Sequence, residues 1–253
     1  MLNVVLLGTG NLARHLFAAI SKSDRAKIVQ VVGRNLNDLA WFSHHTAVSN
    51  DFNDVFDANI YLIAVKDDAI AQVSKCLANK PGVVAHTSGA TDMDVLIPEN
   101  KGVFYPLQSF TKGRELNFKN IPICIEAKEE SSLQVLKELA NSISDNVQEI
   151  DSEQRKKLHL AAVFVSNFTN YLYGVGKEIC VEEGLSFDLL KPLILETAEK
   201  VQTFAPRDAQ TGPARRKDRL SMQNHLKLLK NEKHIALYQL LSDAIKEVYE
   251  EKL

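Results

Sequence analysis

Two groups of polar residues in the sequence have the side chains that proton transfer requires. The first, His86 and Ser88, follows a short apolar run. The second, His159, Ser166 and Asn167, lies in a segment that is otherwise largely apolar. An imidazole exchanges protons near neutral pH, and hydroxyl and amide groups can hydrogen-bond a reacting oxygen or nitrogen. We predict four catalytic residues: His86, Ser88, His159 and Asn167. The alternative is that the histidine at the strand end is a hydrogen-bonded structural residue.

A glycine-rich segment near the N-terminus has the pattern of a dinucleotide-binding loop. An apolar run leads into Gly8-Thr9-Gly10-Asn11-Leu12-Ala13, and a helix-like stretch follows. Gly8 would permit a tight turn, Gly10 a close approach of the pyrophosphate, and Ala13 the contact between helix and strand. Free N–H groups at the start of the helix would bind the phosphates. Two alternatives are a turn that needs glycine for its geometry alone and a related loop that binds S-adenosylmethionine.

The residues after the second apolar strand distinguish between NAD and NADP. An NAD site usually has an acidic residue there, which binds the ribose hydroxyls, whereas this sequence continues with Gly33-Arg34-Asn35. A guanidinium can pair with the 2′-phosphate that a carboxylate would repel. We therefore predict NADP(H) as the cofactor, and the alternative for Arg34 is an exposed surface charge. The predicted cofactor-binding residues are Gly8, Thr9, Gly10, Asn11, Leu12, Ala13, Gly33, Arg34, Asn35, Ala64, Val65 and Lys66, the last three at the end of the next buried strand.

These residues are positioned by strands and helices that alternate over the first 150 residues. Near-continuous apolar strands separated by helix-like stretches are typical of a parallel sheet covered by helices on both faces. We predict strands at 2–7, 28–32, 60–65, 83–86, 103–105, 121–125 and 147–150, and helices at 11–22, 36–42, 67–77 and 131–142. Since the carboxyl ends of parallel strands line the ligand crevice of such a sheet, His86 and Ser88 are expected near the nicotinamide.

The pattern becomes purely helical from about residue 150. We predict an α/β fold with two domains: a Rossmann-type doubly wound, mostly parallel sheet in residues 1–150, and an all-α domain for substrate binding and dimerisation in residues 151–253. Further helices are predicted at 188–204, 218–229 and 232–251.

The first helix of the second domain is expected to be long and largely buried. It is predicted over residues 151–183, with Asp151 and Gln154 as a capping pair, and it ends at Gly184. In a regular helix His159, Ser166 and Asn170 fall in one sector, with Asn167 beside it. This polar stripe is predicted to face the crevice between the domains, because buried polar groups need partners. A structural network that holds the helices in register is the alternative.

Composition excludes several classes of function. The chain has 253 residues, 45% of them hydrophobic and 25% charged, as in ordinary soluble globular proteins. A net charge of −2 gives no global field for nucleic acid or a membrane. Three distant cysteines, no export signal and no apolar run long enough to span a bilayer are typical of a cytoplasmic protein. His44 and His45 lack acidic or cysteine companions at ligand spacing, so no metal site is predicted.

The helical region carries two further signals. Residues 210–219 contain Arg215, Arg216, Lys217 and Arg219, which we interpret as a site for an anionic group of the substrate or cofactor. A solvated helix start is the alternative. The apolar surface expected on a helical region of this length predicts a homodimer through the helices after Asp151.

Several motifs, in their order and spacing, resemble those of a known family. The chain resembles Rossmann-like NADP-dependent oxidoreductases with a helical domain of the DUF2520 type, which are relatives of pyrroline-5-carboxylate reductase and of the 6-phosphogluconate and β-hydroxyacid dehydrogenases. The resemblance covers nearly the whole chain. Its motifs are Gly8-Thr-Gly10-Asn-Leu-Ala13, Gly33-Arg34-Asn35, Ala64-Val65-Lys66-Asp67-Asp68, His86-Thr-Ser88-Gly89-Ala90, Tyr105-Pro106-Leu107-Gln108-Ser-Phe110, His159-Leu-Ala-Ala with Ser166-Asn167, and Thr211-Gly212-Pro213-Ala-Arg215.

The resemblance implies a nicotinamide-binding domain, a helical domain that completes the site, and a dimer formed through the helical domain. Two positions depart from the pattern. Val163 stands where β-hydroxyacid dehydrogenases have a proton-transfer lysine, one turn before Asn167, so their oxidative decarboxylation is not expected here. Tyr105 stands where relatives often have histidine before proline.

Together these observations predict an NADP(H)-dependent oxidoreductase. It would transfer a hydride between nicotinamide and a small carbonyl, imine or alcohol substrate of anionic or polar character. Two alternatives are a non-catalytic NADP-binding sensor or partner-binding protein, which the absence of the lysine favours, and an S-adenosylmethionine-binding enzyme.

Overall fold

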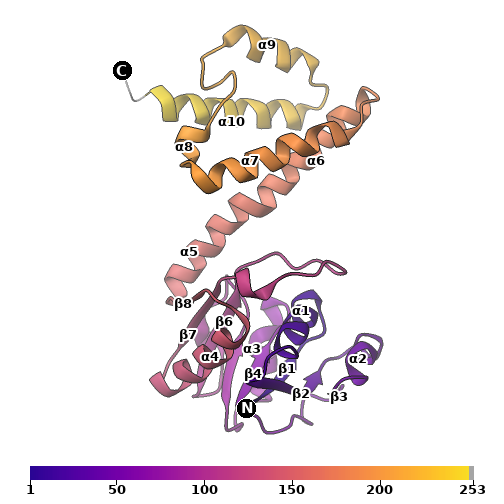
Figure 1. Ribbon diagram of the computed structural model, residues 1–253, viewed down its shortest axis with the longest axis vertical. Coiled ribbons are helices and arrows are strands. Elements are labelled where there is room, and N and C mark those ends of the chain that lie inside the picture. Colours follow the sequence, from indigo (N-terminus) through magenta and orange to yellow (C-terminus); the bar gives the residue numbers. More distant parts are fainter. Residues whose placement is uncertain (251–253) are drawn as a thin grey trace. The chain divides into compact units, whose positions relative to one another are not determined.

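All strands of the structure, a computed structural model that describes residues 1–250, belong to one eight-stranded sheet (Figure 1). The order is β3-β2-β1-β4-β5-β6-β7-β8. Neighbours from β3 to β6 are parallel, β7 is antiparallel to β6, and β8 is parallel to β7. The strands are β1 (Leu2–Leu7), β2 (Ala26–Val32), β3 (Ala47–Ser49), β4 (Ile60–Ile63), β5 (Val83–His86), β6 (Lys101–Pro106), β7 (Ile123–Ala127) and β8 (Val147–Glu149). The predicted Rossmann-type, mostly parallel sheet is confirmed.

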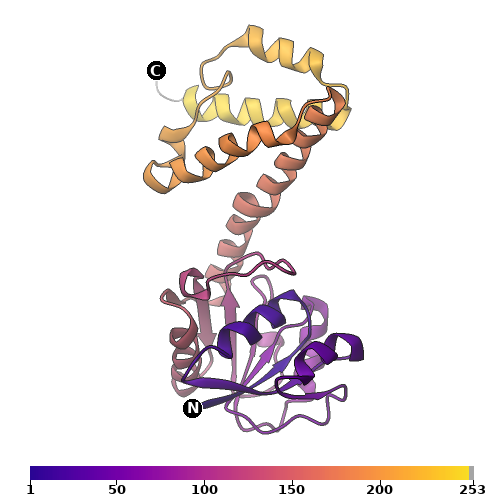
Figure 2. The same ribbon diagram turned by 45° about the vertical axis from the view of Figure 1, so that its right-hand side comes forward.

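Helices cover both faces of this sheet. α1 (Asn11–Ile20), α2 (Leu36–Ser43) and α4 (Glu130–Ile143) pack on one face, and α3 (Ile70–Lys75) packs on the other. The sequence of β1 explains why two cores form, because successive side chains of a strand point to opposite faces. Val4 and Leu6 belong to the core under α1, whereas Val5 and Leu7 belong to the core under α3. In Figure 2 the indigo helix α1 lies in front of the strands.

The sequence did not predict the edge strand β3. It has three residues, Ala47–Ser49, and pairs with only the last three residues of β2. An element this short has no measurable alternation of apolar and polar residues. It forms because the end of β2 offers an unpaired edge next to it.

The first compact unit of the structure, Met1–Phe168, includes residues that follow the sheet. α5 (Ser152–Ala162) begins at Asp151, whose carboxylate accepts a hydrogen bond from the backbone N–H of Gln154 at 2.8 Å. The side chain of Gln154 accepts one in return from the N–H of Asp151, so the predicted capping pair is present. The change from strands to helices thus falls at residues 149–152, while the compact unit continues to Phe168.

The long helix is neither regular nor largely buried. A π-helical segment, Val163–Phe168, separates α5 from α6 (Thr169–Glu182). A π-turn contains one residue more than an α-turn, so the angular positions predicted for a regular helix do not hold beyond Ala162. Phe164 and Val165 were expected to be buried, yet they are 60% and 75% exposed in the single chain. Both expectations from the sequence were therefore wrong.

The second unit begins at Thr169 and is helical. α6 ends near Gly184, whose φ of +67° fits glycine. After it come α7 (Lys191–Thr203), α8 (Pro206–Ala209), α9 (Arg219–Leu228) and α10 (Glu232–Glu250), with α10 between α7 and α9 in Figures 1 and 2. Its side chains are mostly exposed: those described as buried are Cys180, Ala214, Met222 and His234. Among residues 1–250, no helix is long and apolar enough to cross a bilayer.

Candidate functional site

The turn between β1 and α1 requires glycine at its first position. Gly8 has a φ of +130°, which side-chain-bearing residues rarely adopt. A Cβ atom built on Gly8 would lie 2.1 Å from the backbone oxygen of Ala64. The turn therefore passes directly over the end of β4, and this contact places Ala64 and Val65 beside the loop.

The start of α1 has the features of a phosphate-binding site. A Cβ atom on Gly10 would meet nothing within 4 Å, so protein packing does not explain glycine at this position. No side chain caps α1, and its first turn has no acidic residue. Its N-terminal N–H groups, from Asn11 to Ala13, therefore lack the capping partners that the ends of many helices have. Uncapped N–H groups beside an open surface suit an anion such as a pyrophosphate.

The end of β2 presents a guanidinium at the same edge of the sheet. A Cβ on Gly33 would lie 2.5 Å from the side-chain methyl of Thr9, so the two loops are in contact. Arg34 is exposed, and no acidic side chain within the described chain pairs with it. The Asn35 side chain accepts hydrogen bonds from the N–H groups of Asn37 and Asp38, at 2.9 and 3.4 Å, and so caps α2. Arg34 is thus available for an anion, whereas the Asn35 side-chain oxygen is already used.

The three residues after β4 become progressively more exposed to solvent. Ala64 is buried and its N–H donates to the oxygen of Leu7, which extends the pairing of β1 and β4. Val65 is half-buried and Lys66 is exposed at the start of a short 3₁₀-helix, Asp67–Ala69. The structure therefore brings Ala64 and Val65 next to the glycine loop, with Lys66 at the rim.

His86 and Ser88 lie at the carboxyl end of β5, but both are held in local hydrogen bonds. Nδ1 of His86 accepts from the N–H of Ser88 at 3.2 Å, and Nε2 lies 3.3 Å from the oxygen of Asp92. The pKa of His86 is lowered to about 4, mainly by burial and secondly by the positive charge of the nearby Arg155. The Ser88 hydroxyl donates to Thr91 Oγ1 at 2.9 Å. This arrangement suits a neutral, structural imidazole better than a proton carrier.

Tyr105 and His159 form a second pair next to Gly89, in which Tyr105 is buried and His159 is half-buried. The Tyr105 hydroxyl lies 3.0 Å from Nδ1 of His159. A Cβ on the neighbouring Gly89 would lie 2.6 Å from that nitrogen and 2.6 Å from Cζ of Tyr105, so only glycine leaves room for the pair. Burial raises the pKa of Tyr105 to about 12, so the phenol keeps its proton at neutral pH. The phenol can then donate to Nδ1 of a neutral imidazole, which leaves the proton of that imidazole on Nε2.

A buried ion pair fixes the helix that carries His159. Arg155 is fully buried, and its guanidinium contacts the carboxylate of Glu126 on β7 and the backbone oxygen of Thr91. Ser152 donates a hydrogen bond to the same carboxylate, at 2.8 Å to Oε2. The first turn of α5 is therefore bonded both to the sheet and to the loop after β5. This docking sets the position of His159 one turn further on.

Ser166 and Asn167 lie apart from this cluster. Both are exposed in the π-helical segment, and neither side chain forms a hydrogen bond with another of the described residues. Asn167 follows His159 by eight residues, about 12 Å along a helix axis. The side chains of His159 and Asn167 are therefore too far apart along the helix to contact the same atom of a small ligand.

Of the basic residues at 215–219 in the helical unit, Arg215 forms contacts within the unit. The guanidinium of Arg215 contacts the backbone oxygen of Gln210 and lies 5.2 Å from the ring centre of Tyr249. Arg216, Lys217 and Arg219 are exposed, and Lys217 has a φ of 56°. Among the described residues, no group of three or more histidine, cysteine or acidic side chains is arranged to hold a metal ion.

Tyr105 and Gly89 were named from the sequence as parts of two family motifs but without a role, and Arg155 and Glu126 were not predicted to belong to this region. Nothing in the spacing of Tyr105 indicated a bond to a histidine 54 residues later. A signal was present for Arg155, because an arginine on the core-facing side of an amphipathic helix needs a buried acidic partner. The sequence alone does not say which acidic residue that is.

Comparison with known proteins places this arrangement in the class of Rossmann-like proteins with a helical second part. Residues 121–245 match the Domain of unknown function DUF2520. No curated protein matches the sequence. The chain is 39% identical to BF3122 of Bacteroides fragilis, described as a "putative NADP oxidoreductase", with a TM-score of 0.90 over 97% of this chain and 98% of that chain. It therefore belongs to the same family as BF3122, the Rossmann-like proteins with a DUF2520 domain, as the motifs predicted.

Two more distant structures share the fold. Protein TM1727 from Thermotoga maritima is 23% identical, with a TM-score of 0.76 over 98% of this chain and 99% of that chain. The imine reductase from Myxococcus stipitatus in complex with NADP+ is 13% identical, with a TM-score of 0.65 over 98% and 93% of the two chains. At these identities the likeness concerns the fold alone.

Proposed function

We propose that the protein is an NADP(H)-dependent oxidoreductase that transfers a hydride between nicotinamide and a small carbonyl, imine or alcohol substrate. The observation that carries this proposal is the placement of the Tyr105–His159 pair at the same edge of the sheet as the uncapped start of α1. Support also comes from BF3122 and from the imine reductase, whose descriptions name NADP.

The residues at this edge fit NADP(H). The open surface at Gly10 and the free N–H groups of α1 would hold the pyrophosphate. Arg34, with no acidic residue at the end of β2, would pair with the 2′-phosphate. Ala64 and Val65 would line the path towards the strand ends. When bound, the nicotinamide supplies or accepts the hydride.

The chain itself would handle the proton that accompanies the hydride. Reduction of a carbonyl or imine delivers a hydride to carbon and requires a proton on oxygen or nitrogen. The imidazole of His159 can supply it by taking a proton from solvent and passing it to the substrate, while the Tyr105 phenol, which keeps its own proton, orients the ring through the 3.0 Å hydrogen bond to Nδ1. His86 and Ser88 would hold the loop after β5 in place, and Asn167 would hydrogen-bond a part of the substrate away from the atom that His159 protonates.

The substrate is proposed to be small and polar or anionic. Lys66, at the rim after β4, and the exposed Arg216 and Arg219 in the second unit are cations that a carboxylate-bearing substrate could use.

The protein is also proposed to form a homodimer, and the role of these cations depends on that assembly. Leu160, Phe164 and Val165 on the first unit are exposed, as are Leu189 and Leu193 on the second. Exposed apolar surface of this extent is typical of protein–protein interfaces.

Light scattering would test the assembly. A dimer at micromolar concentration is expected, and the double substitution Phe164→Glu with Val165→Glu should shift it towards monomer because two charges would enter the apolar surface. Exposed Lys75→Glu on α3 is the control with an added negative charge. A monomeric unmodified protein would contradict the dimer.

A panel of small 2-oxo acids, aldehydes and cyclic imines, followed through oxidation of NADPH, tests the function. Turnover with at least one member, reduced in Tyr105→Phe, supports an oxidoreductase. NADPH binding without turnover of any member would favour the second candidate, a non-catalytic NADP-binding protein. That candidate is favoured by Val163, which stands where related dehydrogenases have a proton-transfer lysine. Binding of S-adenosylmethionine in place of NADPH would contradict both.

A further inference from the structure

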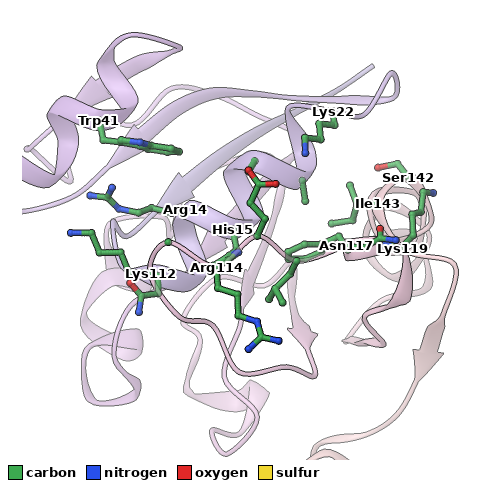
Figure 3. A pocket seen from close by; sticks show the side chains of 17 residues that line it. Arg14, His15, Lys22, Trp41, Lys112, Arg114, Asn117, Lys119, Ser142 and Ile143 are labelled. Atoms are coloured by element: carbon green, nitrogen blue, oxygen red, sulfur yellow. The ribbon is translucent and has the colours of Figure 1, made fainter. Parts of the chain in front are cut away.

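A cavity of about 800 Å³ lies on the outer side of α1, on the helix layer of the first unit (Figure 3). Its wall is formed by α1, by the loop that joins β6 to β7, by the end of α4 and by Trp41 of α2. Cavities of this volume commonly hold small-molecule ligands. We call it the α1 cavity; it is lined by Asn11, Arg14, His15, Ala18, Ala19, Lys22, Trp41, residues 112–119, Ser142 and Ile143.

The α1 cavity has a strong excess of positive charge. Five cationic side chains line it against one acidic residue, Glu115, which is notable in a chain with a net charge of −2. The cations are Arg14, Lys22, Lys112, Arg114 and Lys119. Two of them have acidic partners: Arg14 lies 3.5 Å from Asp38, and Lys119 lies 3.2 Å from Asp145. The other three have no ion pair with any residue from 1 to 250.

These cations surround a floor that is partly apolar. Ala18 and Ala19 of α1, Trp41 and Ile143 are among the residues that line the cavity. In Figure 3, Arg14, Lys112 and Trp41 lie on one side of the cavity, and Lys22, Lys119 and Ile143 lie on the opposite side. Cations at opposite sides favour a ligand that carries more than one acidic group, because a single charge would leave one side unneutralised.

Hydrogen bonds hold the loop that closes the cavity. The side-chain amide of Asn11 donates to the oxygen of Phe110 at 3.1 Å, and Nε2 of His15 lies 3.1 Å from the oxygen of Thr111. The cavity therefore has a defined wall on the side of the loop. Asn11 is also the first residue of α1, so the cavity begins next to the phosphate-binding turn. From there it extends along α1 to Lys22, just beyond the C-terminal end of the helix.

We propose that the α1 cavity is a second binding site, separate from the coenzyme site, for a small polyanion with two or more carboxylate or phosphate groups. Lys22, Lys112 and Arg114 supply the charges that are not used by the protein. Arg14 supplies a fourth charge. Its ion pair with Asp38, at 3.5 Å and partly in contact with solvent, is weak, so an anionic ligand can replace Asp38 as its partner. This site does not depend on the hydride chemistry proposed above.

The single tryptophan of the chain reports on this cavity. Trp41 lines it, is 40% exposed, and lies with its ring centre 5.1 Å from the guanidinium carbon of Arg14. Tripolyphosphate and citrate are the probes, titrated separately at constant ionic strength into full-length protein saturated with NADP+. A saturable change in Trp41 fluorescence is expected, with half-saturation at about 1 mM or below for at least one probe. A preference for tripolyphosphate indicates a phosphorylated ligand, and a preference for citrate indicates a polycarboxylate; either supports the site.

Charge-reversed variants locate the binding. Lys112→Glu combined with Arg114→Glu should weaken probe binding at least tenfold. Both side chains are exposed, so the fold is expected to remain, and Lys22→Gln provides a milder second variant. Lys75→Glu on α3, which packs on the other face of the sheet, and Arg34→Glu at the end of β2 should change binding less than twofold. The proposal is overturned if neither probe gives a saturable change, if Lys75→Glu or Arg34→Glu weakens binding as much as the double variant, or if the probe binds only to protein without NADP+.

Discussion

The hydroxyl of Tyr105 lies 3.0 Å from Nδ1 of His159, where β6 ends and α5 passes the sheet. Gly89 leaves the space in which the two rings meet, and the ion pair of Arg155 and Glu126 holds α5 in position. Burial keeps the phenol protonated, so it stays a neutral hydrogen-bond partner that orients the imidazole. This pair is the centre of the chemistry proposed here.

Tyr105→Phe removes the phenol while it keeps the aromatic ring. We expect kcat to fall about a hundredfold, because general acid catalysis contributes at least this much and the imidazole would lose the hydrogen bond that orients it. NADPH affinity should stay within twofold, since the proposed phosphate-binding residues belong to other elements, the start of α1 and the end of β2. Stopped-flow single-turnover measurements would separate the chemical step from product release. Unchanged kcat would show that Tyr105 does not take part in proton transfer.

Arg34→Asp tests the choice of cofactor. We expect the unmodified protein to bind NADPH at least tenfold more tightly than NADH, about 1.4 kcal/mol. The substituted carboxylate would repel the 2′-phosphate and accept hydrogen bonds from a ribose, so the preference should be lost or reversed. Fluorescence titrations with both reduced nucleotides measure it. Equal affinity of the unmodified protein for the two would contradict the assignment.

Asn167→Ala tests the role of the π-helical segment. The amide is exposed and is proposed to contact the substrate and not the phosphates, so NADPH affinity should remain nearly unchanged while turnover falls. Ser166→Ala is the matched control on the neighbouring exposed residue. Equal turnover of Asn167→Ala and the unmodified protein would leave Asn167 without a part in substrate binding.

The pH dependence of stability should reflect the buried His86. Its pKa falls from 6.5 to about 4 on folding, so the unfolded chain binds more protons than the folded one between these values. Stability from this residue is complete above pH 6.5 and is lost as the pH falls towards 4, by up to about 3 kcal/mol. Urea unfolding at pH 7 and pH 4.5 measures the loss. His86→Gln, which does not titrate, should lose less; an equal loss would contradict the prediction.

Glu126→Gln should destabilise the protein and disturb His159 together. The substitution leaves the guanidinium of Arg155 buried without a counter-charge, at a cost of about 3 kcal/mol. Because Arg155 fixes the first turn of α5, kcat should fall as well, and the pH profile of kcat should shift. Glu99→Gln removes an exposed ion pair with Lys128 and is the control. A large loss of stability with an unchanged pH profile would separate the ion pair from the position of His159.

Local sequence determined much of the fold. The alternation of apolar runs with helical stretches was sufficient for the sheet, because each strand and helix buries side chains with its own period. The glycine loop could also be predicted from the sequence, since a turn with a φ of +130° requires glycine at position 8. The Asp151–Gln154 pair marked the start of α5 because both members lie within one turn.

Tertiary structure decided the grouping of the polar residues. His86 was a candidate proton carrier by residue type, but burial and two local hydrogen bonds keep it neutral. Tyr105 and His159 became a pair only because α5 docks through Arg155 against β7. The π-helical segment changed the predicted polar stripe, because an extra residue per turn rotates all later side chains around the axis. A sequence specifies residue types and local periods directly, whereas distances between residues far apart in the chain, and the burial that shifts a pKa, exist only after the elements have packed.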